Sequence, residues 1–299
     1  MARKENWFTR RLSAKSRDLA KRVLCRINGC LRYLYQIDPA LSAKLFPMSP
    51  GRHGYVVTAQ QNLQVDDGQA VPPSNLRLGE GDAKGWLAGG VSDVQRMAAL
   101  LKTAGLKFSD ASRILDYGCS AGRMIRHLKG ALKSTEVWGV DVASEHIYWN
   151  QLHLDSRFNF ATVTTLPSLP FEDNYFGLVY AGSVFTHIDD LCDATLLELR
   201  RITKAGGLLY LTFLDDATLE QYRQHADNAF YQLVLNSTFY QEYEATKAVK
   251  FVFGRSLNSY VYFRTDFLRA KLSKWFELLA VQPQGYGTTQ TVYLLKKRL

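Results

Sequence analysis

From about residue 113 the sequence alternates short apolar segments with longer segments of helical periodicity, and this alternation limits the possible folds more than any other feature. Short apolar strands joined by helices are typical of a parallel sheet, because a parallel connection needs a crossover that is usually helical. Helices are predicted at residues 91–105, 122–132, 144–153 and 190–203. Strands are predicted at residues 113–117, 136–140, 157–162, 176–181 and 207–213.

Two further apolar segments, residues 277–281 and 291–296, are separated only by a short turn that contains glycine. A connection this short cannot make a right-handed crossover, so the pair is predicted to be antiparallel. The segments together predict an α/β fold with a seven-stranded, mostly parallel sheet, helices on both faces and an antiparallel last strand. Residues 216–265 break the alternation and are predicted to form an added helix and a lid.

Positive charge is concentrated in the first part of the chain. Residues 1–52 contain 12 Lys or Arg and 3 Asp or Glu, which accounts for the whole net charge of +9. Because the rest is neutral overall, a nucleic-acid-binding face spread over the protein is not expected. The predicted organisation is a basic helical arm at 1–38, an irregular linker or cover at 39–84 that is rich in Pro and Gly, and one domain at 85–299.

The basic arm has the spacing of an amphipathic helix, since apolar residues recur at intervals of three and four between Phe8 and Leu34. Two interpretations remain open: attachment to an anionic membrane surface, or packing of the apolar stripe on this domain or a second subunit. No apolar run long enough to span a membrane and no secretory signal is recognised. A cytoplasmic protein is expected, with peripheral contact at the inner membrane face as the alternative location.

The most specific motif is a strand that turns through Gly118 and Gly122 into a helix. Glycine lets the backbone approach a ligand where a Cβ atom would collide, and the following helix N-terminus offers unpaired N–H groups. A dinucleotide fingerprint would have glycine at Ser120 and Arg123 as well, so a pyrophosphate cofactor is disfavoured. Asp141 ends the second strand, where a carboxylate can accept hydrogen bonds from both hydroxyls of a ribose.

With these residues the chain resembles the class I methyltransferases that use S-adenosylmethionine (SAM), in particular the small-molecule group whose first motif is D-x-G-C-x-x-G-R. The resemblance implies a Rossmann-like fold and SAM as the cofactor. The remaining two strands follow where the family places them. The matching segments, in the family's order, are 116–123 (DYGCSAGR), 139–142 (GVDV), 169–176 (LPFEDNYF), 183–188 (SVFTHI), 197–202 (LELRRI) and 205–209 (AGGLL).

The resemblance also assigns roles to single residues of a cofactor pocket. Asp116 is expected to hold the amino-acid end of SAM, Asp141 its ribose hydroxyls and Val142 its adenine. Thr164 and Thr165 stand where the family often has an acid that faces the adenine amine. The full predicted cofactor set is Asp116, Gly118, Cys119, Gly122, Asp141, Val142, Thr164, Thr165 and Ser183.

The segment after the fourth strand carries the candidate catalytic residue. Ser183 is expected beside the transferred methyl group, and His187 is the best-placed general base because its ordinary pKa lies near neutrality. His187 has a competing interpretation, in which it fixes the loop or caps the helix near Asp189 and Asp190. Neither the histidines nor the four cysteines stand at metal-ligand spacing, so no metal is predicted.

An aromatic stretch between residues 230 and 263 supplies the candidate acceptor site. Tyrosine edges suit sugars and other polyhydroxylated ligands, but the same residues are equally suited to an ordinary helix-to-core face. Both interpretations remain open.

O-methylation of a sugar, glycan or secondary metabolite is the leading predicted function. The fourth strand ends in Tyr-Ala-Gly-Ser at residues 180–183, which lacks the Asn/Asp-Pro-Pro-aromatic motif of DNA amine methylases, and no Pro-Cys pair marks a cytosine enzyme. The predicted partner is therefore a small-molecule or glycan acceptor. Two alternatives remain: an RNA or protein methyltransferase that uses the basic arm, and a non-catalytic SAM-binding or scaffold protein.

Overall fold

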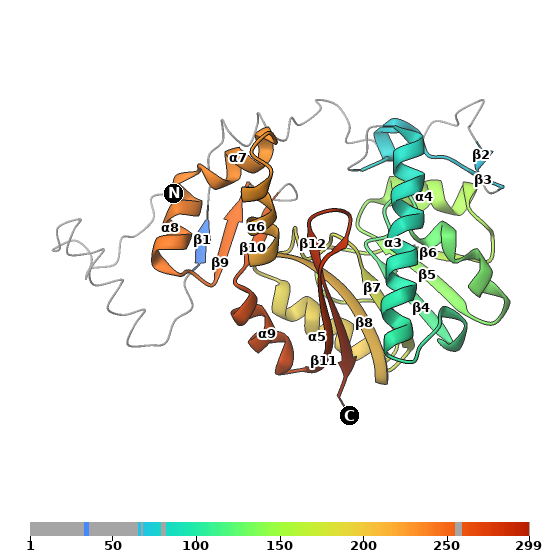
Figure 1. Cartoon of the computed structure of the whole chain (residues 1–299). Coiled ribbons are helices and arrows are strands. Elements are labelled where there is room, and N and C mark those ends of the chain that lie inside the picture. The colour runs from blue at the N-terminus through green and yellow to red at the C-terminus, as the bar shows by residue number, and fades with distance from the viewer. Residues whose placement is uncertain (1–32, 36–64, 67, 79–81, 255–258, 299) are drawn as a thin grey trace, which may run out of the picture.

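The structure, a computed structural model, describes residues 33–35, 65–66, 68–78, 82–254 and 259–298 (Figure 1). For residues 33–35 and 65–66 it describes the backbone alone. The body of the protein is a long sheet with helices packed on both of its faces, as the sequence predicts.

Seven strands form the predicted sheet, in the order β6, β5, β4, β7, β8, β12, β11. Its parallel strands are β4 (Arg113–Tyr117), β5 (Glu136–Asp141), β6 (Asn159–Thr162), β7 (Phe176–Ala181) and β8 (Thr203–Asp215). The strand β12 (Gln290–Lys297) lies antiparallel to both β8 and β11 (Phe276–Tyr286), so the predicted antiparallel last strand is confirmed. The strand order reverses between β4 and β7, and open α/β sheets bind their ligands at such a switch point.

The two faces of this sheet are covered by different helices. On one face α5 (Cys192–Ile202) and α9 (Thr265–Ser273) bury leucines against the strands. On the other face the cover is α3 (Ala83–Thr103) and the 3-10 helix η4 (Ile125–Lys133). A further helix, α4 (Ser144–His153), packs beside β5 and β6. The cofactor motifs are therefore anchored in two continuous apolar cores.

Two helix predictions needed correction at their boundaries. The helix predicted at 91–105 begins earlier, at Ala83, because the Asp82 side chain caps it by accepting a hydrogen bond from the Gly85 N–H. The helix predicted at 122–132 is a 3-10 helix that begins only at Ile125. Gly122 has a φ of +83°, which no α-helix accepts, so regular structure starts after it.

Residues 216–265 contain more than the predicted helix. Three helices, α6 (Asp216–Gln224), α7 (Ala229–Leu235) and α8 (Thr238–Thr246), enclose a separate apolar cluster. Two strands that the sequence did not predict, β9 (Lys250–Phe253) and β10 (Tyr260–Phe263), continue the sheet beyond β8. The β10 strand pairs in parallel with the last residues of β8. The sheet therefore has ten described strands, and we call residues 216–263 the insertion.

The tenth strand corrects part of the arm prediction. Residues Tyr33–Tyr35 form β1, which pairs in parallel with β9, so the helix predicted across 1–38 is wrong at these three residues. The edge of β9 offers unpaired backbone groups, and pairing with them outweighs the helical periodicity of the local sequence. The rest of the predicted arm lies outside the described residues.

The described part of the predicted linker is a small cover on η4. It contains β2 (Val65–Asp66), β3 (Gln69–Ala70) and the 3-10 turn η2 (Ser74–Leu76), while a second 3-10 turn, η3 (Phe108–Asp110), precedes β4. The buried Arg126 of η4 donates to the carbonyls of Gln69 and Ala70 at 3.1 and 3.0 Å.

Among the described residues, every helix is too short or too polar to cross a bilayer.

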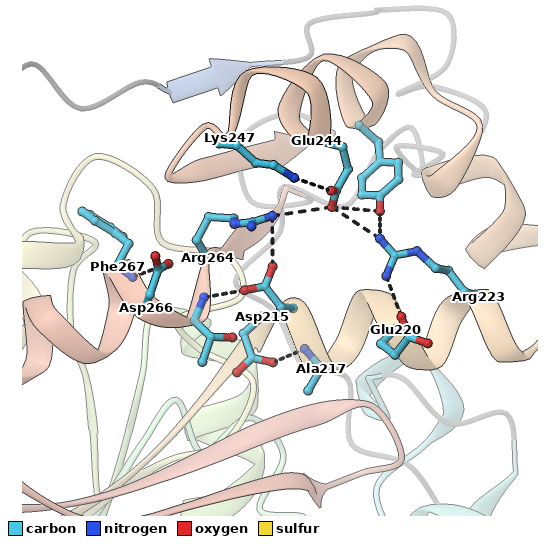
Figure 2. A network of polar contacts seen from close by, with 12 residues as sticks. Asp215, Ala217, Glu220, Arg223, Glu244, Lys247, Arg264, Asp266 and Phe267 are labelled. Carbon is cyan, nitrogen blue, oxygen red and sulfur yellow. Dashed lines mark hydrogen bonds and ion pairs between the residues drawn. The ribbon is translucent and has the colours of Figure 1, made fainter. Parts of the chain in front are cut away.

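A polar network attaches α8 of the insertion to α6 and to the start of α9 (Figure 2). Glu244 pairs with Arg223 at 3.4 Å, with Lys247 at 3.6 Å and with Arg264 at 3.7 Å. Arg264 also pairs with Asp216 at 3.5 Å. Because these side chains are between 25% and 66% exposed, we expect the network to fix how the helices are arranged more than it stabilises them.

Candidate functional site

The loop after β4 crosses the end of β5. The N–H groups of Gly118 and Cys119 both donate to the Val140 carbonyl, at 2.8 and 3.0 Å. Gly118 has a φ of +82°, and a Cβ atom built on it would lie 2.4 Å from Cγ2 of Val184. Only glycine satisfies both conditions, so the backbone of this loop is kept bare at the switch point.

Ser120 stands where a dinucleotide fingerprint would have its second glycine. Its φ of +48° is a left-handed conformation that a non-glycine residue adopts at a cost of about 1–2 kcal/mol. The Ser120 N–H donates to Oδ2 of Asp141 at 2.8 Å, and its hydroxyl lies 3.3 Å from Nδ1 of His146. These contacts hold the loop in place without the glycine.

Asp141 links the loop after β4 to the residues that follow β5. Its Oδ2 accepts from Ser120 and its Oδ1 accepts from the Ala143 N–H, each at 2.8 Å. A carboxylate offers about four acceptor positions, so two remain for ribose hydroxyls. Asp141 is partly exposed, and next to it Val142 presents an apolar side chain that is 46% exposed. A polar site beside an open apolar surface suits a ribose and its attached base.

Asp116 is a buried carboxylate with few partners. It is 3% exposed, and the Tyr180 hydroxyl donates to its Oδ2 at 2.8 Å. Burial raises the pKa of Asp116 to about 7, against the lowering effects of the Tyr180 hydrogen bond and the Arg123 charge. Among the described residues it forms no direct ion pair, so a cationic ligand would relieve the cost of burying it.

A buried ion pair, which the sequence analysis did not predict, stands behind the glycine loop. Arg123 pairs at 2.8 Å with Asp93 of α3, whose side chain is 2% exposed. Arg123 also donates to the Tyr286 hydroxyl, and Asp93 accepts from the Gly287 N–H at 2.9 Å. Arg123 therefore joins the loop, α3 and the β11–β12 turn. No short motif marks Asp93 or Tyr286, because these residues are brought together only by the fold.

The remaining predicted cofactor residues lie around this loop in two groups. Cys119 points inward, 3.7 Å from Nδ2 of Asn150, and burial raises the pKa of its thiol, so only its backbone can face a ligand. Thr164 and Thr165 are exposed just beyond β6. Their predicted role beside the adenine amine stays a prediction.

Ser183 and His187 lie in the segment after β7. Ser183 has a φ of +58°, its N–H donates to the Thr212 hydroxyl at 2.7 Å, and its hydroxyl accepts from Gln290 at 2.9 Å. The Nδ1 atom of His187 lies 2.8 Å from the Ser259 carbonyl oxygen. A carbonyl can only accept, so Nδ1 carries the proton and Nε2 of the neutral ring is the basic atom. Partial burial lowers the pKa of His187, although its side chain keeps an exposed part.

The residues present fit SAM on three observations. Gly118 leaves a bare backbone where a Cβ atom would clash, Asp116 is a buried carboxylate that suits the cofactor's ammonium group, and Asp141 retains acceptors for its ribose. Asp116, Asp141 and the exposed Val142 thus follow the order of the cofactor's amino-acid end, ribose and adenine, with the bare loop between the two carboxylates.

Comparison with known proteins gives a consistent result. Residues 115–211 match the family model described as a methyltransferase domain. An uncharacterized methyltransferase of Schizosaccharomyces pombe is 33% identical over 104 residues, which is 32% of this chain and 37% of that protein. The match therefore covers little more than a third of the curated relative.

Solved structures with a similar fold include a SAM-dependent methyltransferase from Methanosarcina mazei, 22% identical over 62% of this chain and 92% of that one, with a TM-score of 0.45. Another is the PH0226 protein of Pyrococcus horikoshii, 19% identical over 62% of this chain and 82% of that one, with a TM-score of 0.46.

Proposed function

We propose that this protein is a class I, SAM-dependent methyltransferase that methylates a hydroxyl group of a sugar, glycan or other small molecule. The match of residues 115–211 to a methyltransferase-domain model supports the proposal. The observation that carries the proposal is the bare glycine loop between two carboxylates, Asp116 at one end and Asp141 at the other. This arrangement holds a ligand that has a cationic amino-acid end and a ribose.

In this proposal the chain itself does little covalent chemistry. Bound SAM would supply a methyl group on a positively charged sulfur. Asp116 binds the ammonium group, Asp141 binds the ribose, and Gly118 lets the ligand lie on the backbone. The residues after β7 then place the acceptor oxygen in line with the methyl carbon, since methyl transfer depends mainly on alignment.

His187 is the proposed general base. The hydrogen bond to the Ser259 carbonyl orients the ring and leaves Nε2 as the proton acceptor, and the lowered pKa keeps the ring neutral at pH 7. Nε2 of His187 would accept the proton of the acceptor hydroxyl as the hydroxyl oxygen takes up the methyl group that bound SAM would supply. General bases contribute about 10²–10⁴-fold to rate. His187→Gln is expected to lose that factor in kcat and keep its SAM affinity.

Incubation with methyl-deuterated SAM and an extract of polar metabolites and glycans tests the reaction. The proposal expects a product that carries the label on oxygen, together with S-adenosylhomocysteine (SAH). A label on nitrogen would contradict hydroxyl transfer. Binding of SAM without any labelled product would favour the non-catalytic alternative, and a reaction without the protein serves as the blank.

Membrane attachment of the basic arm, residues 1–38, stays a prediction from the sequence. Its support is the excess of Lys and Arg along an amphipathic pattern. Flotation with anionic liposomes tests it, and equal flotation of a chain that lacks residues 1–38 would contradict it. Salt-sensitive RNA binding that depends on the same residues would favour the nucleic-acid alternative.

A further inference from the structure

Four aromatic side chains of the insertion form a continuous row of ring contacts that begins at His187. The His187 ring lies 5.8 Å from the Tyr260 ring, Tyr260 lies 5.2 Å from Phe230, and Phe230 lies 6.4 Å from Tyr231. Tyr231 stacks on Tyr222 at 4.0 Å, with the two planes 6° apart. We call Tyr222, Phe230, Tyr231 and Tyr260 the aromatic wall.

The wall spans the two segments that border the cofactor loop. At one end is His187, whose own segment lays Val184 against Gly118. At the other end is the turn between β11 and β12, where Gln221 of α6 donates to the Thr288 carbonyl at 2.6 Å and Thr218 donates to the Thr289 carbonyl at 2.8 Å. The same turn follows Tyr286, which rests on Gly182 at the end of β7. The wall is thereby connected to both segments that border the cofactor loop.

Three members of the wall are only partly buried. Phe230, Tyr231 and Tyr260 keep exposed area, whereas Tyr222 behind them is buried. None of the four side chains carries a charge at pH 7, and burial raises the pKa of Tyr260 further from neutrality. A row of partly exposed aromatic rings suits a ligand with a flat apolar face.

We propose that the aromatic wall binds an acceptor built on a ring, an aryl or a pyranose ring, and presents one of its hydroxyls to His187. This inference rests on the proposed function and adds the shape of the substrate. Aryl rings and the C–H faces of pyranoses share the required chemistry, a flat apolar face with hydroxyls at its rim. An open-chain polyol has the same hydroxyls without the face and is excluded.

Saturation-transfer NMR on the full chain saturated with SAH tests the proposal with three probes. These are methyl β-D-glucopyranoside, catechol and D-glucitol, the last as an open-chain control. The proposal expects transfer to one or both ring probes and none to glucitol. Transfer to catechol alone identifies an aryl site, and transfer to the glucoside alone identifies a sugar site.

Paired variants then assign the binding to the wall. Phe230→Leu combined with Tyr260→Leu should reduce ring-probe affinity by about tenfold, because each substitution removes one aromatic contact. Phe239→Leu is the matched control, since Phe239 belongs to the same apolar cluster and lies outside the wall. SAH affinity should stay unchanged in all variants, which also shows that they fold.

Three results overturn the inference alone: SAH binding by the wild type without transfer to either ring probe, transfer to D-glucitol, and ring binding that the double variant leaves intact. If the wild-type chain fails to bind SAH, the proposed function falls and takes this inference with it. The two failures are thus distinguishable in one set of samples.

Discussion

The cofactor loop and the insertion specify their structures in different ways. In the loop, at residues 118–122, the backbone limits which residue types are possible. Three of these residues have a positive φ, and a Cβ atom at Gly118 or Gly122 would clash with neighbouring side chains. In the insertion, aromatic residues pack in a shared cluster, and none of these aromatic residues has a positive φ that would restrict its residue type. Motifs can be read from sequence where the backbone dictates the residue, and the chemistry of packed surfaces cannot.

The largest expected effect is on the loop. Gly118→Ala places a methyl group 2.4 Å from Val184 at a φ of +82°. It should weaken SAH binding by more than about a hundredfold, or about 2.7 kcal/mol. Isothermal titration calorimetry measures this.

A glycine with the same backbone conformation and free space around it is the control. Gly105 has a φ of +74° and nothing within 4 Å of its Cβ position. Gly105→Ala should lower the free energy of unfolding by about 1 kcal/mol and leave SAH affinity unchanged. Equal losses of affinity in both variants would mean that Gly118 acts on stability, not on the ligand.

The second effect concerns the ribose site. Asp141→Ala should weaken SAM binding by at least about tenfold, or about 1.4 kcal/mol, because charge-assisted hydrogen bonds are lost. Glu145→Gln, which changes an exposed acid in the first turn of α4, should bind as the wild type does. Unchanged affinity in Asp141→Ala would contradict the assignment.

The third effect is on pH dependence: the free energy of unfolding and the SAM affinity should change with pH in opposite directions. The pKa of Asp116 is about 7 in the folded chain and about 3.9 in an unfolded one. Between these values the folded state holds one more proton, so the contribution of Asp116 to the free energy of unfolding falls as pH rises towards 7 and is level above it. SAM affinity should do the reverse, since the ammonium group needs the ionised carboxylate, and should drop as pH falls below 7.

Asp116→Asn separates these two curves from other titrations. The variant should lose the stability slope between about pH 4 and 7 and bind SAM weakly at every pH. Chemical denaturation and calorimetry across this range measure both. A wild-type affinity that stays flat from pH 8 to pH 6 would argue that Asp116 does not contact the cofactor.

The smallest effect belongs to the insertion. Glu244→Gln weakens the pairs with Arg223, Lys247 and Arg264 shown in Figure 2. Because exposed pairs contribute about 0.2–1 kcal/mol, stability should fall by no more than about 1 kcal/mol. SAH affinity should not change. A marked loss of affinity would break the distinction between the two regions, since it would connect the insertion to the cofactor loop.

Most of the main sheet could be predicted from the sequence, because its strands are short apolar runs between helices. The strands β4 and β7 begin and end at the predicted residues, and the antiparallel β12 follows from a turn too short for a crossover. The strands β9 and β10 were missed. They pair antiparallel with each other, and each also pairs with a strand that lies far away in the sequence, β1 for β9 and the end of β8 for β10. Pairing of that kind leaves no local periodicity.

The residues of the candidate site also divide into those that local sequence predicts and those that only the fold brings together. Gly118, Gly122 and Asp141 could be predicted because the two glycines follow the first predicted strand and Asp141 ends the second, and parallel strands end at the same edge of the sheet. The ion pair of Asp93 with Arg123 joins α3 to the loop, and only the folded chain brings these residues together. The orientation of His187 depends likewise on the backbone carbonyl of Ser259, 72 residues away.

The central claim is that one ligand lies on the bare loop between the carboxylates of Asp116 and Asp141. A crystal structure of the full chain grown with excess SAH tests it most directly. The account predicts the ligand's amino group at Asp116, its ribose hydroxyls at Asp141 and its adenine against Val142. A ligand bound elsewhere, or this loop filled by the chain's own side chains, would contradict it.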